Sequence, residues 1–309
     1  MLRTALLSLA RGFTMGAADI VPGVSGGTIA LIFGIYDRLI ASVRAGSSAL
    51  GHLIRGDLTG TRKWLTRIDW VFILPLGAGI LVAVALLSGV LKTLLLEQAV
   101  LMASLFVGLV AGSIVVTWQM IPRVSGRHVA IMVGVALLLF LSLGLRSGTT
   151  EDAVSQLTDP ALWAFFGAGA IAICAMILPG ISGSFLLILM GMYGPVLGAV
   201  TDRDFASLGV LILGTIVGLA LFSQVLHKAL QLHHDNVIAA LIGLMAGSMR
   251  VLWPWPLGVD STALGAPDSR IAAAIAIAAV AFVLVIIVAR VAQRLERADQ
   301  ARSEASERR

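Results

Sequence analysis

The chain has 309 residues, of which 58% are hydrophobic and only 13% are charged, and its mean hydropathy is +0.98. Soluble globular domains carry roughly 25% charged residues, so this composition excludes a water-soluble protein and predicts a membrane protein. The basic residues lie between apolar stretches and not in one aromatic-laced patch, which argues against nucleic-acid binding. The single cysteine, Cys174, leaves no disulfide framework and no thiolate metal site.

The first apolar stretch, Gly12–Tyr36, contains Asp19 and is interrupted by the segment Pro-Gly-Val-Ser-Gly-Gly at 22–27. Proline lacks an N–H group and glycine loosens the backbone, so this stretch is expected to form two half-helices around an unwound centre. Irregular backbone survives in lipid only where it is buried in protein or lines a wet cavity. We therefore predict a re-entrant hairpin over 12–41. The basic N-terminal segment 1–11 lacks a clear cleavage site and is expected to be retained.

Three apolar windows long enough to cross a bilayer follow, since a span needs about 20 residues: Trp70–Leu91, Gln98–Pro122 and Val129–Leu145. The uncharged stretch Pro160–Thr201 then repeats the broken pattern, with Pro-Gly-Ile-Ser-Gly-Ser at 179–184, and predicts a second re-entrant hairpin over 160–201. Three more windows complete the chain before a charged tail at 293–309: Phe205–Leu226, Asn236–Trp253 and Ile271–Ala289. His227–Asp235, with His233 and His234, is expected to be a loop.

The loop charges predict an orientation. If each hairpin returns to the side that it left, 17 of the 22 Lys and Arg residues share one side with both termini. Six of them lie in the predicted loop Arg38–Arg67. The positive-inside rule makes this side cytoplasmic, so we expect a multi-pass protein of the bacterial cytoplasmic membrane with both termini in the cytoplasm.

The two broken stretches align with each other at a constant offset of 157 residues. The matching positions of the first stretch are Pro22, Gly23, Ser25, Gly26, Gly34 and Tyr36, and those of the second are Pro179, Gly180, Ser182, Gly183, Gly191 and Tyr193. A second pair of segments, 108–113 and 243–248, aligns at an offset of 135.

Each half has one hairpin and three spans, so the second half begins on the opposite side. The predicted fold is an all-α membrane protein with an inverted-topology repeat, with halves 1–150 and 151–292, an arrangement that recurs in transporters. Gly108, Gly112, Gly243 and Gly247 are expected to allow close helix packing.

The half-helix after each break starts with unpaired N–H groups at the positive end of a helix dipole, which suits a phosphate or a carboxylate. The residues expected to bind phosphate are Gly23, Ser25, Gly26, Gly27, Thr28, Gly180, Ser182, Gly183, Ser184 and, near a span end, Arg250. Asp19 is either a proton or charge relay or a cap of the following half-helix; the residues leave both roles open. Its repeat counterpart is Met176. No metal or cofactor is expected.

Two other functions are weighed. Gly23-Val24-Ser25-Gly26-Gly27 fits the G-x-S-x-G pattern of hydrolases, but no strand precedes it and no His–Asp pair accompanies it. A lipid-modifying enzyme is therefore disfavoured, and the chain has no Walker A motif. A transporter or channel for a small anion, using the same helix termini, stays open.

The segment from Met15 to Thr28, continuing to Gly34-Ile35-Tyr36, closely resembles the polyprenyl-phosphate transporter family of bacteria, and the second motif at 179–184 extends the similarity over nearly the whole chain. The resemblance implies translocation of undecaprenyl phosphate, the C55 lipid carrier of cell-wall synthesis, for reuse, with no catalytic activity. It implies the polyprenyl-phosphate lipid and the bilayer as partners, and leaves a homo-oligomer possible. The second motif departs from the first at Ser184, which replaces Gly27, and at Met176, so a symmetrical two-acid mechanism is not expected.

Overall fold

The computed structural model describes residues 2–19, 25–144, 157, 160–180, 183–256, 263–267 and 270–307. Within these residues the chain is helical, apart from one isolated bridge between Pro256 and Leu264. Five of the described helices are long and apolar enough to cross a membrane. The prediction of an all-α, multi-pass membrane protein is confirmed.

Both predicted breaks are present. The first broken stretch and the basic segment after it consist of α1 (Leu2–Asp19), α2 (Gly26–Ile32), α3 (Tyr36–Ile54) and α4 (Leu58–Leu65); its re-entrant course in a bilayer stays a prediction. The second consists of α8 (Leu162–Ile177), α9 (Gly183–Leu189) and α10 (Tyr193–Thr201). The short helices α2 and α9 each have seven residues and lie at equivalent repeat positions.

The chain reverses after α2 and after α9 in the same way. Gly34 and Gly191 have φ angles of 65° and 66°, a conformation that only glycine adopts without strain. The Gly34 amide donates to the carbonyl of Leu31 at 3.0 Å, and the Gly191 amide donates to that of Ile188 at 2.9 Å. The duplication seen in the sequence is thus matched in local backbone structure, whereas the inverted orientation of the halves in a bilayer stays a prediction.

The long helices are α5 (Trp70–Glu97), α6 (Ala99–Trp118), α7 (Gly126–Gly144), α11 (Phe205–Ser248) and α12 (Ile271–Glu307). The first three predicted spans and the last each correspond to one of them. The backbone of α12 continues as a helix into the charged tail, where nothing interrupts it.

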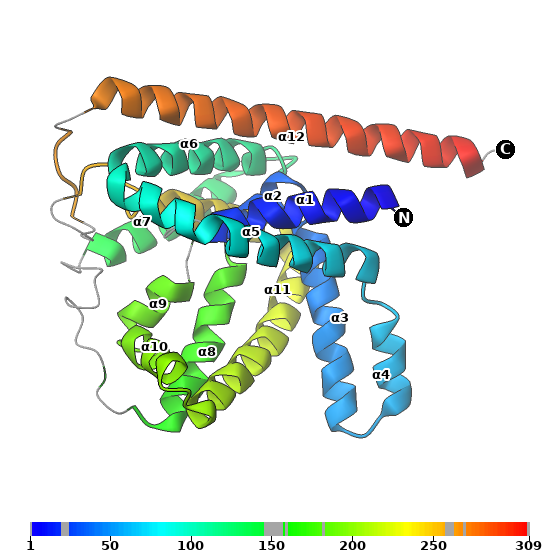
Figure 1. Ribbon diagram of the computed structural model, residues 1–309. Helices are drawn as coiled ribbons and strands as arrows, with labels where there is room; N and C mark the ends of the chain where they lie inside the picture. The colour runs from blue at the N-terminus through cyan, green and yellow to red at the C-terminus, as the bar shows by residue number, and fades with distance from the viewer. Residues whose placement is uncertain are drawn as a thin grey trace.

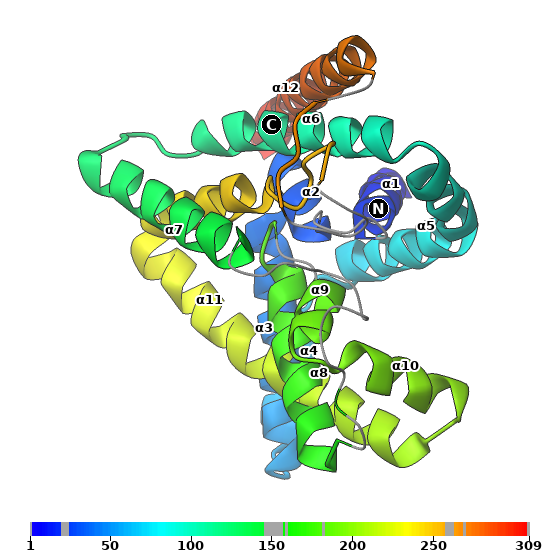
Figure 2. The same cartoon turned by 90° about the vertical axis from the view of Figure 1, so that its left-hand side faces the viewer.

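The prediction of a loop at 227–235 is wrong. The fourth and fifth windows lie in the single helix α11, in which only His233, with φ −142° and ψ 46°, leaves helical geometry. Residues 219–248 contain no proline, and their two glycines, Gly243 and Gly247, come after the kink. The backbone is therefore helical on both sides of one kink, where the helix changes direction (Figures 1 and 2). At 1.5 Å per residue the part before the kink, 205–232, is about 42 Å long and the part after it, 234–248, is about 22 Å long.

The basic segment Arg38–Arg67 was expected to be a loop and is also mostly helical, because it contains α3 and α4. Asp57 starts α4 as its N-cap, since its carboxylate accepts a hydrogen bond from the Gly60 amide at 2.8 Å. Regularly spaced alanine, leucine and arginine residues favour helix here over an extended connection.

The glycine-rich spans pack against spans from the other half of the chain. Along α6, which lies beside α12 (Figure 1), a side chain at Gly108 would overlap the carbonyl of Ala278. Along α11, a Cβ atom at Gly243 would lie 2.5 Å from the carbonyl oxygen of Met132 in α7. The expected role of these glycines in close packing is confirmed, and the last helix of each half is exchanged onto the other half.

The centre of the protein is α2. Ala30 and Leu31 are at most 1% exposed and belong to the largest apolar cluster, together with Val110 of α6 and with Ile238 and Met245 of α11. By contrast, α7 buries only Leu143 among its residues. The glycine-containing segment after the first break is therefore held inside the protein, and the outer spans present apolar side chains to lipid.

The helix crossing at Gly243 gives a test of this packing. Gly243→Ala is expected to destabilise the protein by about 1–3 kcal/mol, the usual cost of overpacking, because the added methyl group pushes α7 away from α11. The readout is thermal unfolding in detergent. Gly134→Ala, in α7, is the control, since its added methyl group would meet no atom within 4 Å. Equal unfolding temperatures for the two variants would contradict the packing.

Candidate functional site: the junction of the two breaks

The first N–H groups of α2 have acceptors within the chain. An Asp19 carboxylate oxygen accepts a hydrogen bond from the Gly26 amide at 2.5 Å, and Ser25 Oγ accepts one from the Gly27 amide at 3.0 Å. The Thr28 amide donates to the carbonyl of Ser25 at 2.9 Å. Asp19 therefore caps the half-helix in this structure, one of the two roles left open by the sequence. Pro22 and Gly23 lie outside the described residues.

The two breaks meet where α2 begins and α8 ends. Ser25 Oγ donates to the carbonyl of Met176 at 3.2 Å, and the Tyr36 hydroxyl donates to that of Ile177 at 3.2 Å. Gly27 is so close to α8 that a Cβ atom there would lie 2.6 Å from the Ile177 oxygen. The positive end of one helix thus contacts the negative end of another, which is electrostatically favourable. We call these five residues the junction.

Thr28 adds a free polar group beside the junction. Its residue is 1% exposed, and its hydroxyl has no hydrogen-bond partner within the part of the chain that the structure describes. A buried hydroxyl without a partner costs about 1–3 kcal/mol. Such a cost is more often tolerated where a ligand supplies the missing partner.

The second break contributes buried backbone after the end of α8. Pro179 and Gly180 are buried, and Gly180 has a φ angle of 83°. A Cβ atom at Gly180 would lie 2.9 Å from the carbonyl oxygen of Leu244 in α11, so only glycine fits both the backbone angle and the space. Ser182 lies outside the described residues, as does the side chain of Ser184.

The two breaks differ chemically. Gly183 packs against Met176 as Gly26 packs against Asp19, so the thioether takes the place of the carboxylate. Met176 is 46% exposed. The described residues of the two breaks therefore include one acidic side chain, Asp19, where the aligned sequences also have one acid and one methionine.

Arg250 follows α11 in the sequence, and its side chain contacts the C-terminal end of α7. Its guanidinium carbon is 4.8 Å from the ring centre of Phe140, and a Cβ atom at Gly144 would lie 2.6 Å from it. A cation at the C-terminal end of a helix is stabilised by the helix dipole. This contact gives Arg250 a structural role; its contact with phosphate stays a prediction.

The paired histidines do not form a metal site in the described residues. His233 occupies the kink of α11, and His234 lies 3.6 Å from the carboxylate of Asp37 and 3.2 Å from that of Asp235. These contacts tie the kink to the start of α3.

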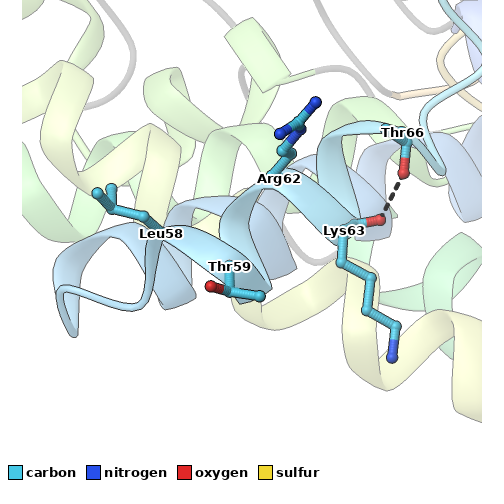
Figure 3. A pocket seen from close by; sticks show the side chains of 5 residues that line it. All are labelled: Leu58, Thr59, Arg62, Lys63 and Thr66. Carbon is cyan, nitrogen blue, oxygen red and sulfur yellow. Dashed lines mark hydrogen bonds between the residues drawn. The ribbon is translucent and has the colours of Figure 1, made fainter.

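A surface hollow of about 540 Å³ is lined by residues of α4 and by Thr66, and by none of the junction residues. Figure 3 shows Arg62 and Lys63 leaving the helix on different sides, while Thr66 Oγ donates to the carbonyl of Lys63 at 2.9 Å. The two cations do not converge on a common point, so the hollow is not a built anion site.

Tyr36 was matched between the repeats but given no role. Its side chain is buried and its hydroxyl connects α3 to the end of α8. The signal was present in the sequence, because the chain has only two tyrosines and both occupy the same repeat position.

Comparison with known proteins supports one family. Residues 15–265 match the model of a family described as undecaprenyl phosphate translocase-like. The chain belongs to this family. It is 38% identical over 246 residues to the polyprenyl-phosphate transporter of Vibrio cholerae serotype O1, which covers 79% of the chain and 76% of the relative. It is 27% identical over 258 residues to the polyprenyl-phosphate transporter of Staphylococcus aureus, covering 80% and 86%. The search of solved structures found no match.

The hydrogen bond between Tyr36 and Ile177 predicts a measurable loss on mutation. Tyr36→Phe is expected to reduce stability by about 1 kcal/mol, because the carbonyl at the end of α8 loses its donor. Thermal unfolding in detergent measures the change. The matched control is Tyr193→Phe, since the Tyr193 hydroxyl has no hydrogen bond within the described residues. The assignment fails if both variants unfold like the wild type.

Proposed function

We propose that this protein carries undecaprenyl phosphate between the leaflets of the bacterial cytoplasmic membrane, so that the lipid carrier is reused in cell-envelope synthesis. The observation that carries this proposal is membership of the translocase-like family over residues 15–265, together with two relatives named as polyprenyl-phosphate transporters. The meeting of the two broken hairpins supports it, because a phosphate crossing hydrocarbon needs polar groups at depth.

In this proposal the phosphate binds at the junction. The hydroxyls of Ser25 and Thr28 and the glycine backbone around them supply donors, and the second break, with Gly180 and the predicted Ser182 and Ser184, closes the site from the other half. The polyprenyl tail stays in lipid. Rocking of two inverted halves about the junction exposes the phosphate to one leaflet and then the other.

In this proposal the protonation state of Asp19 controls whether phosphate binds. Its carboxylate already accepts the Gly26 amide, so an incoming phosphate competes for the same donor and is repelled by the same charge. Protonation of Asp19, or of the phosphate, removes the repulsion. This makes Asp19 the coupling residue in addition to the helix cap.

The decisive experiment measures which leaflet holds undecaprenyl phosphate in vesicles with and without the protein. We expect leaflet exchange in protein-containing vesicles only, and exchange that responds to a pH gradient. Asp19→Asn is expected to retain exchange and lose the response, because the amide needs no proton to admit phosphate. Asp202→Asn, which changes an exposed acid, is the control. Passage of inorganic phosphate without lipid exchange would instead favour a small-anion channel.

Thr28→Val separates a structural from a functional role for the buried hydroxyl. Because the hydroxyl has no partner in the described protein, the isosteric valine is expected to leave stability unchanged or to raise it. Transport is expected to fall roughly tenfold, which corresponds to the loss of about 1.4 kcal/mol of binding. Wild-type transport by Thr28→Val would remove this hydroxyl from the site.

A further inference from the structure

A second, more enclosed cavity lies between α3, the start of α5 and the first part of α11, with a volume of about 300 Å³. We call it the α3 groove; its lining includes Val43, Leu50, Ile73, Ile216 and Leu219. The volume is at the lower end of the range for ligand pockets.

Two polar side chains that line the α3 groove, Ser47 and Trp70, are already hydrogen-bonded within the protein. Ser47 Oγ donates to the carbonyl of Arg44 at 2.9 Å and lies 3.3 Å from Ser223 Oγ, while the Trp70 indole donates to the carbonyl of Leu65 at 2.9 Å. The surface offered to a ligand is therefore apolar.

Two arginines that do not line the groove are next to its lining residues in the sequence. Arg44 and Arg67 each directly adjoin a lining residue in sequence, Val43 and Ile68, and both stack on Trp64, at 5.6 and 4.5 Å from the ring centre. Within the described residues neither has a carboxylate at ion-pair distance. The nearby acids are occupied, because Asp69 pairs with Arg38 and Asp57 pairs with His52.

Two neighbouring cations without an anionic partner are electrostatically unfavourable, which favours the binding of an anion between them. Arg44 is half-buried and Arg67 is exposed, and a charge that is partly removed from water is stabilised by an anionic partner. The position of Arg44 beside Arg67 adds repulsion between like charges, which stacking on one indole offsets only in part. A phosphate between the two guanidinium groups would compensate both.

The α3 groove is connected to the junction by one helix. α3 begins at Tyr36, which bonds the end of α8, and the groove begins at Ser42. Six residues of helix place its near end about 9 Å along α3 from Tyr36. Figure 1 shows α3 beside the first part of α11.

We infer that the α3 groove and the Arg44–Arg67 pair form a second binding site for polyprenyl phosphate, with the head group on the arginines and the first isoprene units in the groove. The inference rests on the proposed function and adds a binding site outside the junction, on the side predicted to be cytoplasmic. A groove of this volume fits one chain, which favours a single-tailed lipid phosphate over a two-chain glycerophospholipid.

The test uses a polyprenyl phosphate with a photoreactive group in its first isoprene units, bound to the full-length protein in vesicles. We expect labelling of the peptides 42–50 and 68–73. Gly46→Leu fills the groove, because the only atom within 4 Å of an added Cβ is Ile68 Cδ1, at 3.8 Å; labelling should fall at least fivefold. Gly51→Leu, on the same helix with no atom within 4 Å, should label like the wild type.

The head group is tested separately. Arg44→Gln with Arg67→Gln should reduce labelling at least fivefold, whereas Arg55→Gln should not, and the uncharged polyprenol probe should label weakly in every variant. The site is overturned if polyprenol labels as well as the phosphate, if phosphatidylglycerol competes equally, or if Gly46→Leu has no effect. Labelling without leaflet exchange in the wild type would refute the proposed function and leave the site standing.

Discussion

The contact between the start of α2 and the end of α8 constrains the rest of the molecule. Ser25 and Tyr36 donate to consecutive carbonyls of α8, and Gly27 allows the two backbones to touch. Each break leaves backbone groups that a helix would have paired internally. In an apolar surrounding such groups need partners within the protein. Asp19 and Ser25 accept from the N–H groups at the start of α2, and Ser25 and Tyr36 of the first half donate to carbonyls at the end of α8 in the second half.

This constraint explains why the protein packs glycine against backbone in so many places. Gly108 allows α12 to approach α6, and Gly243 allows α7 to approach α11; α6 and α11 are long helices that pack with α2 in the central apolar cluster. The exchanged final helices, α7 and α12, then cover the partner half. A duplicated chain whose halves are interlocked in this way can hold two short broken helices in place without a large polar core.

The junction also links stability to function. Asp19 stabilises α2 as a cap while occupying a donor that a phosphate would use. The unpartnered hydroxyl of Thr28 belongs to the same helix, two residues after Gly26. Most hydrogen-bond donors of the site have acceptors within the protein, and the Asp19 carboxylate competes with an incoming anion. Such a site can release an anion as well as bind it, and transport requires both. The apolar α3 groove and the Arg44–Arg67 pair would supply the lipid phosphate from one side.

The sequence alone determined the membrane class, the two breaks and the duplication, because hydropathy, proline and glycine act through local backbone physics. It also predicted the family from the motif around Asp19. It misjudged 227–235, since a kink at His233 needs no helix-breaking residue. Tertiary packing decided the other contacts: the carbonyls to which Ser25 and Tyr36 donate, the half that α12 covers, and the stacking of Arg44 and Arg67 on one tryptophan. These contacts join segments that are far apart in the sequence, so no local sequence pattern indicates them.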